Sequence, residues 1–130
     1  MKAVDTNILA RLVLGDDPEQ ASLAARVLAE PVWVTDSVWV ELGWVLSKRL
    51  TMDRFAAADA LATILSLDTV NTANREGLFW AIDRFRKGAN WADMVHLVSA
   101  HTVATSFVSF DPRIRRDAGA EPPLPIELPA

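Results

Sequence analysis

Four acidic residues stand out in this chain because each lies among apolar neighbours. Asp5 follows a short apolar run near the N-terminus, and Glu41, Asp93 and Asp111 lie in similar surroundings farther along. A carboxylate is costly to bury, so the fold must either use each acid or satisfy it with a partner. If the fold brings the four side chains together, their oxygens form a cage suited to a hard divalent cation.

Asp5 and Asp111 share a position, because each ends a short apolar segment that predicts a strand, Lys2–Asp5 and Phe107–Phe110 respectively. Ligands of open α/β sheets bind beyond the carboxyl ends of the strands, so these acids meet in one crevice if their strands are neighbours. Each acid also suits a simpler role as a helix N-cap, and Pro112 strengthens that alternative for Asp111. Both interpretations stay open.

Glu41 lies within the apolar stripe of a predicted helix, which is formed by Val38, Leu42, Val45 and Leu46. A glutamate inside such a stripe would be desolvated, and its pKa would rise unless a cation or a hydrogen-bond donor compensated. The alternative is that Glu41 lies at the edge of the stripe and its carboxylate reaches solvent.

Asp93 lies in the first turn of another predicted helix, for which Asn90 is the expected N-cap. An acid at the third helical position is typical of a capping box and also suits the helix dipole. A ligand role is compatible with this position, because the first turn of a helix can present a carboxylate to a site. Each acid alone therefore has a structural explanation, but no single one covers all four.

The acids are carried by alternating strands and helices. The predicted strands are Lys2–Asp5, Pro31–Thr35, a minor strand around Val70, and Phe107–Phe110. The predicted helices are Asn7–Leu14, one from the cap Asp17 to Ala29, one from Asp36 or Ser37 to Arg49, one from the cap Thr51 to Leu67, Asn74–Lys87, Asn90–Val103, and a short turn or helix at Pro112. The proline-rich tail, Pro122–Pro129, is expected to be an edge strand or extended. This alternation predicts an α/β domain with a mostly parallel sheet. Since no repeat or linker interrupts the sequence, we expect a single domain, residues 1–130.

The composition narrows the class of protein. Half of the residues are hydrophobic (51%), which indicates a folded core, and there is no cysteine for disulfides or zinc–thiolate sites. No segment resembles a signal peptide or a membrane span, so we expect a soluble, cytoplasmic protein without a membrane partner. The net charge of −4 argues against binding nucleic acid by charge alone, although four clustered carboxylates would account for it.

Two of the five tryptophans, Trp39 and Trp44, lie on the helix that carries Glu41. A separation of five residues corresponds to about 140° around an α-helix, so the two indoles cannot both face the core. We expect one of them to join a partner surface, where tryptophan is enriched.

On these residues the chain resembles PIN domains, in particular the VapC-type toxins of bacterial toxin–antitoxin pairs. The matching segments, in order and spacing, are Val4-Asp5-Thr6-Asn7, Glu41, Ala92-Asp93-Met94-Val95-His96 and Ser109-Phe110-Asp111. The resemblance implies a single PIN-like domain with a parallel sheet of about five strands flanked by helices. It also implies Mg²⁺- or Mn²⁺-dependent ribonuclease activity on RNA, homodimerisation, and inhibition by a small antitoxin protein.

The resemblance further implies that Asp5, Glu41, Asp93 and Asp111 form the acidic metal site, with Thr6, Asn7 and Ser109 as polar support. Many relatives have another acid where this chain has Asn90, so the rim of the site carries fewer negative charges here and a second metal would bind more weakly.

These residues suggest a division of roles in phosphodiester hydrolysis. We expect Asp5 and Asp93 to bind the principal metal, Asp111 to complete the cage, and Glu41 to orient or deprotonate the attacking water. Contacts with the substrate need local basic patches, and the preferred set follows Asp111 closely: Arg113, Arg115 and Arg116. Two other candidate patches are Lys48-Arg49 with Arg54, and Arg84-Arg86-Lys87. Solvated helix ends would explain any one of these patches equally well.

Three other functions compete with this hypothesis. A phosphohydrolase of the aspartyl, haloacid dehalogenase type would need a second acid at the position of Asn7, and a phosphoacceptor receiver domain would need a lysine after Lys87. The third alternative is a catalytically inert binding module with the same PIN fold, which the sequence alone does not exclude.

Overall fold

The computed structural model describes residues 1–129 of the 130-residue chain. These residues form two compact units, Met1–Ala73 and Asn74–Ala130, and each unit is described here by itself. Within residues 1–129, no helix is both long enough and apolar enough to cross a lipid bilayer.

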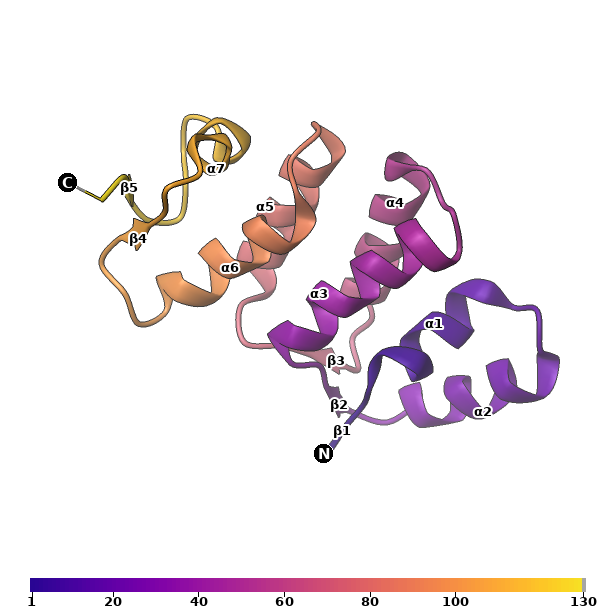
Figure 1. Ribbon diagram of the computed structural model, residues 1–130. Helices are drawn as coiled ribbons and strands as arrows, with labels where there is room; N and C mark the ends of the chain where they lie inside the picture. Colours follow the sequence, from indigo (N-terminus) through magenta and orange to yellow (C-terminus); the bar gives the residue numbers. More distant parts are fainter. Residues whose placement is uncertain (130) are drawn as a thin grey trace. The chain divides into compact units, whose positions relative to one another are not determined.

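A parallel three-stranded sheet organises the first unit (Figure 1). Its strands are β1 (Lys2–Ala3), β2 (Val32–Trp33) and β3 (Val70–Asn71), in the order β1-β2-β3. Backbone hydrogen bonds extend the pairing beyond these short strands. The amide of Val4 donates to the carbonyl of Trp33 at 3.1 Å, and that of Val34 donates to the carbonyl of Asn71 at 2.9 Å. β1 is therefore an edge strand of this sheet, and the chain leaves it at Asp5.

Helices connect these strands, as parallel pairing requires. They are α1 (Thr6–Leu14), α2 (Pro18–Leu28), α3 (Asp36–Trp44), the π-helix η1 (Val45–Arg49) and α4 (Arg54–Leu65). α1 packs against α2 and α3, and α4 packs against α3 and η1. Gly15 ends α1 with φ of 61°, a left-handed conformation that glycine adopts without steric cost.

Trp39 is the largest side chain in the core of the first unit, and it is fully buried. Its indole Nε1 donates a hydrogen bond to the hydroxyl of Thr72, just after β3, at 3.0 Å. Side chains from each layer complete this core: Leu9, Val32, Val34, Leu42, Leu46, Leu61, Leu65 and Val70. The tryptophan therefore connects α3 to the third strand by both packing and a satisfied polar contact.

The second unit contains α5 (Arg75–Arg86), α6 (Trp91–His101), β4 (Phe107–Val108), α7 (Pro112–Ala118) and β5 (Ile126–Glu127). α6 packs against α5 and α7, and β4 pairs in parallel with β5. Gly77 permits the close approach of α5 to α6, because a Cβ at this position would lie 2.5 Å from Cγ1 of Val98. The chain leaves β4 toward Asp111, as it leaves β1 toward Asp5.

The order of elements and the α/β class with parallel pairing agree with the sequence-based expectation. The strands differ from it, since those of residues 1–129 lie in a three-stranded and a two-stranded sheet rather than in one sheet of about five. The number of about five strands in one sheet came from the resemblance to PIN domains, and each strand here has only two residues. Strand pairing depends on contacts distant in sequence, which local patterns do not specify.

Two predicted helix caps were wrong. Thr35, rather than Asp36 or Ser37, caps α3 by accepting a hydrogen bond from the amide of Val38. Asp53, rather than Thr51, caps α4 by accepting from the amide of Ala56 at 2.8 Å. Threonine and aspartate have similar capping preferences, so the choice between near neighbours is set by the path of the chain.

The Trp39 contact gives a test of this core. We expect Trp39→Phe to lower the free energy of unfolding by about 1–3 kcal/mol, because it removes packed atoms and leaves the hydroxyl of Thr72 without its donor. Trp44→Phe, at a position that is 56% exposed on the same helix, is the matched control and should change stability by less than about 0.5 kcal/mol. Urea denaturation followed by circular dichroism measures both values, and equal effects would contradict the role assigned to Trp39.

Candidate active site

Asp5 occupies the turn between β1 and α1, where its carboxylate is exposed to solvent. One carboxylate oxygen accepts a hydrogen bond from the amide of Ile8 at 3.3 Å, so Asp5 is the N-cap of α1. This contact uses a single lone pair of one oxygen and leaves the other oxygen open. The cap therefore fixes the carboxylate at the carboxyl end of an edge strand without using up its capacity as a ligand.

Glu41 is exposed on α3, so the predicted desolvation of this acid was wrong. The helix buries Trp39, Leu42 and Gly43, and Glu41 lies about 200° around the helix from Trp39. The apolar residues near Glu41 in sequence include some that belong to the π-helical segment, where the α-helical period no longer applies. Of the two interpretations of Glu41, the structure supports the one in which its carboxylate reaches water.

A cavity of about 630 Å³ lies beside Glu41 in the first unit. Its lining residues come from α1, α3 and η1: Asn7, Ser37, Val40, Glu41, Trp44, Val45 and Arg49. Two of the predicted site residues, Asn7 and Glu41, therefore share one cavity, because α1 and α3 pack against each other.

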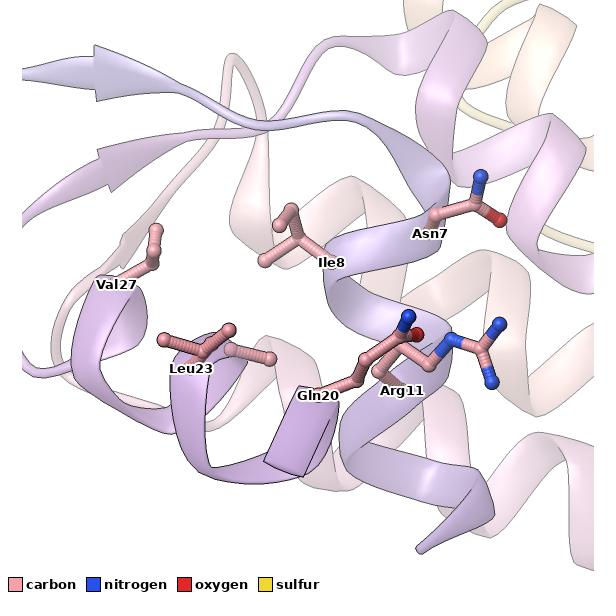
Figure 2. Close-up of a pocket in the computed structure, with 7 residues that line it drawn as sticks. Asn7, Ile8, Arg11, Gln20, Leu23 and Val27 are labelled. Atoms are coloured by element: carbon pink, nitrogen blue, oxygen red, sulfur yellow. The ribbon is translucent and has the colours of Figure 1, made fainter. Parts of the chain in front are cut away.

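Asn7 also borders a second, more apolar cavity of about 410 Å³ between α1 and α2 (Figure 2). Ile8, Leu23 and Val27 point into this space, whereas the amide group of Asn7 points away from it. The neighbouring Thr6 is buried, and its hydroxyl has no hydrogen-bond partner among residues 1–129. An unpaired buried hydroxyl beside Asp5 is unusual, since most buried polar groups are hydrogen-bonded.

Asp93 occupies the first turn of α6 in the second unit, as the sequence predicts. The side chain of Asn90 caps this helix by accepting a hydrogen bond from the amide of Asp93 at 3.0 Å. Partial burial raises the pKa of the Asp93 carboxyl, and the negative charges of Asp111 and Asp117 raise it further, while His96 acts in the opposite direction. Burial is the largest of these influences on the pKa of Asp93.

Asp111 has a different electrostatic environment. Arg113 forms a two-pronged contact with it, through Nε at 3.0 Å from one carboxylate oxygen and a terminal nitrogen at 2.9 Å from the other. The amide of Arg113 also donates to Asp111 at 2.9 Å, which makes this acid the N-cap of α7. These hydrogen bonds lower the pKa of the Asp111 carboxyl. Ser109 holds the same turn, because its hydroxyl accepts from the Asp111 amide at 3.0 Å.

All three arginines expected to bind the substrate have partners within the second unit. Arg113 contacts Asp111, Arg115 donates to the backbone carbonyl of Ile126, and Arg116 pairs with Asp117 at 3.2 Å. Each guanidinium thus contacts an acceptor on α7 or on a segment beside it, as expected for arginines that stabilise a helix and its flanking segments. A phosphate would have to compete with a protein acceptor at each position.

Asp117 is a residue that the sequence-based reasoning missed. Its carboxylate accepts a hydrogen bond from the backbone amide of Asn90 at 3.2 Å, and its carbonyl accepts from Nε of Arg84 at 2.7 Å. Asp117 therefore connects α7 to the start of α6, where Asp93 lies. No local pattern signals these contacts, because Asn90 and Arg84 lie 27 and 33 residues away from Asp117 in the sequence.

The donor set fits a hard divalent cation, because all four predicted ligands are carboxylates. Among residues 1–129, the carboxylates of Glu41 and Asp93 accept no hydrogen bond, so their oxygens are available. Among residues 1–129, no three or more Asp, Glu, His or Cys side chains are grouped in a way that could hold a metal. Asp5 and Glu41 belong to the first unit, and Asp93 and Asp111 belong to the second.

A comparison with protein-family models identifies the class of protein. The model of the PIN domain matches residues 2–119, so the chain belongs to the PIN domain family. PIN domains are generally nucleases that use divalent metal ions, and the matched region contains all four acids. No curated protein matched the chain.

The Arg113 contact gives a prediction for Asp111. The pKa of the Asp111 carboxyl is lowered in the folded protein from its ordinary value of 3.8. Such a group stabilises the fold at pH values above its ordinary pKa, and this stabilisation is lost as the pH falls through the lower pKa of the folded state. We expect Arg113→Gln to raise the pKa of Asp111 toward 3.8, because both side-chain hydrogen bonds disappear. A carboxyl-carbon NMR titration measures this value directly.

Arg116→Gln is the control for that titration, because Arg116 acts on Asp111 through charge alone and is a minor cause of the shift. It should move the pKa of Asp111 less than Arg113→Gln does. If the two variants shift this pKa equally, net charge rather than the two-pronged contact controls Asp111.

Proposed function

We propose that this protein is a divalent-metal-dependent endoribonuclease and the toxin component of a toxin–antitoxin pair. The observation that carries the proposal is the PIN family match over residues 2–119, which includes Asp5, Glu41, Asp93 and Asp111. The same match spans both compact units, which supports treating residues 1–130 as one PIN-like domain.

The proposal requires the four carboxylates to act at one site. Asp5 and Asp111 support it by their equivalent positions, since each follows a strand that lies at the edge of its own sheet. Asp93 supports it by its place in the first turn of α6, where its carboxylate accepts no hydrogen bond among residues 1–129.

A cation held by these carboxylates would neutralise the phosphodiester, lower the pKa of a bound water and stabilise the leaving oxygen. In this proposal Asp5 and Asp93 are the principal ligands for Mg²⁺ or Mn²⁺. Glu41 accepts a proton from the attacking water and orients it, which suits an exposed carboxylate that has no hydrogen-bonding partner among residues 1–129.

The remaining residues would support these acids. Asn7 lines the same cavity as Glu41, and Ser109 fixes the turn that carries Asp111. Asp111 completes the ligand set only if the cation displaces Arg113 or reaches Asp111 through a water molecule, because Arg113 occupies both carboxylate oxygens. Thr6 would support Asp5 from the buried side of α1.

The toxin assignment carries further expectations. We propose that the protein acts in the cytoplasm as a homodimer, cleaves RNA, and is restrained by a small antitoxin protein. An inert PIN-fold binding module is the alternative, and it differs from the enzyme in one measurable respect, the dependence of RNA cleavage on metal and on the acids.

We expect Asp5→Asn and Asp93→Asn each to lower the rate of Mn²⁺-dependent RNA cleavage by about a hundredfold or more, since the lost interaction with the cation is worth several kcal/mol. Both variants should keep the circular dichroism spectrum of the unmutated protein. Gel analysis of a labelled single-stranded RNA, with Mn²⁺ and with EDTA, measures the rates.

Asp16→Asn is a matched control, because Asp16 is an exposed acid outside the predicted site. It should leave the cleavage rate unchanged. Full activity in a folded Asp5→Asn variant would contradict the enzyme proposal, and RNA binding without cleavage by the unmutated protein would favour the inert module.

A further inference from the structure

Trp44 is an exposed tryptophan at the end of α3, one turn beyond Glu41. Its side chain is 56% exposed, whereas Trp39, five residues earlier, is fully buried. Exposing so large an apolar side chain has no benefit for folding, because burial of the indole would contribute favourably. Trp44 also lines the cavity beside Glu41, so its indole is available to a ligand that enters this cavity.

The π-helix η1 begins immediately after Trp44 and ends at Arg49. In an α-helix these two residues would diverge by about 140° around the axis. The wider turn of η1 is closed by the i→i+5 hydrogen bond from the amide of Leu50 to the carbonyl of Val45, at 3.0 Å. Residues five apart are thereby brought toward one face, and Arg49 lines the same cavity as Trp44. π-Helical turns occur frequently at functional sites.

Arg49 is also the candidate cation with a free guanidinium. It is exposed, and within residues 1–129 it forms no hydrogen bond or ion pair. This distinguishes it from Arg113, Arg115 and Arg116, each of which contacts an acceptor in its own unit. A phosphate can approach Arg49 without displacing a protein group.

We propose that the cavity lined by Trp44, Arg49 and Glu41 is a nucleotide subsite, in which one base of a single-stranded RNA stacks on the indole of Trp44 and an adjacent phosphate contacts Arg49. This inference rests on the proposed function, because Glu41 belongs to both sites. It adds the residues that would hold the substrate beside the reacting phosphate.

The dimensions and chemistry of the cavity favour a nucleotide over a protein partner. Its volume of about 630 Å³ lies in the range of ligand pockets, and a base needs an aromatic face together with polar groups at its edge. Asn7, Ser37 and Glu41 supply donors and acceptors around Trp44. A purely hydrophobic partner surface would leave these polar groups and Arg49 unpaired on binding.

The subsite is tested by the binding of a fluorescein-labelled 2′-O-methyl oligoribonucleotide, followed by fluorescence anisotropy in EDTA and low salt. We expect Trp44→Ala to weaken binding about 5- to 150-fold, because stacking of one base is worth about 1–3 kcal/mol. Trp44→Phe should retain most of the affinity, since it preserves an aromatic face. Arg49→Gln should weaken binding and reduce the dependence of log K on log salt by about 0.7.

Phe55→Ala is the matched control, because Phe55 is an aromatic residue on α4 that is even more exposed than Trp44 and is not among the residues that line the cavity. It should leave the affinity unchanged. The subsite is contradicted if Trp44→Ala binds as tightly as the unmutated protein, if Phe55→Ala weakens binding equally, or if an RNA duplex competes as well as the single strand. An altered oligomeric state of Trp44→Ala with unchanged RNA binding would instead assign Trp44 to a protein interface and overturn the proposal.

Mn²⁺ affinity, measured on the same variants, separates this proposal from the proposed function. Trp44→Ala should bind Mn²⁺ as the unmutated protein does, whereas Asp5→Asn should not. Loss of RNA binding in Trp44→Ala while Asp5→Asn binds Mn²⁺ normally would support the subsite and contradict the metal site. Normal RNA binding in Trp44→Ala together with weakened Mn²⁺ binding in Asp5→Asn would do the reverse.

Discussion

Helix N-terminal capping is the interaction that positions three of the four acids. Asp5 caps α1, Asp111 caps α7, and Asp93 is held in the first turn of α6 by the side chain of Asn90. The cap at Asp5 fixes the backbone while one carboxylate oxygen stays free, whereas at Asp111 Arg113 also occupies both oxygens. Capping a helix and binding a metal are therefore compatible roles for the Asp5 carboxylate. The sequence left these two roles open as alternatives, and the structure allows both.

The two acids of the second unit show how environment separates chemically identical groups. Burial raises the pKa of Asp93, whereas the hydrogen bonds from Arg113 lower that of Asp111. The carboxylate of Asp111 is already paired with the guanidinium of Arg113. The carboxylate of Asp93 has no ion pair among residues 1–129, so a bound cation would stabilise its ionised form more. In the proposed site, a direct contact between Asp111 and the metal would require Arg113 to release the Asp111 carboxylate.

The sequence predicted the elements well and the placement of side chains less well. The order of helices and strands, and the caps Asp17 and Asn90, follow from local residue preferences, and the structure agrees with them. Glu41 was misplaced because the apolar pattern around it continues into a π-helix, whose period differs from the one assumed. The arrangement of the strands in two sheets, the partners of the arginines and the role of Asp117 depend on contacts between distant residues, which no local pattern encodes.

Manganese affinity in a double-mutant cycle tests the proposed function most directly, because the proposal has Asp5 and Asp93 bind the same ion. Electron paramagnetic resonance would give the Mn²⁺ dissociation constants of the unmutated protein, Asp5→Asn, Asp93→Asn and the double variant. If both carboxylates bind the same ion, each single substitution should weaken binding strongly, and the double variant should be little worse than either. An unchanged affinity in either single variant, or losses that simply add, would contradict a shared metal site.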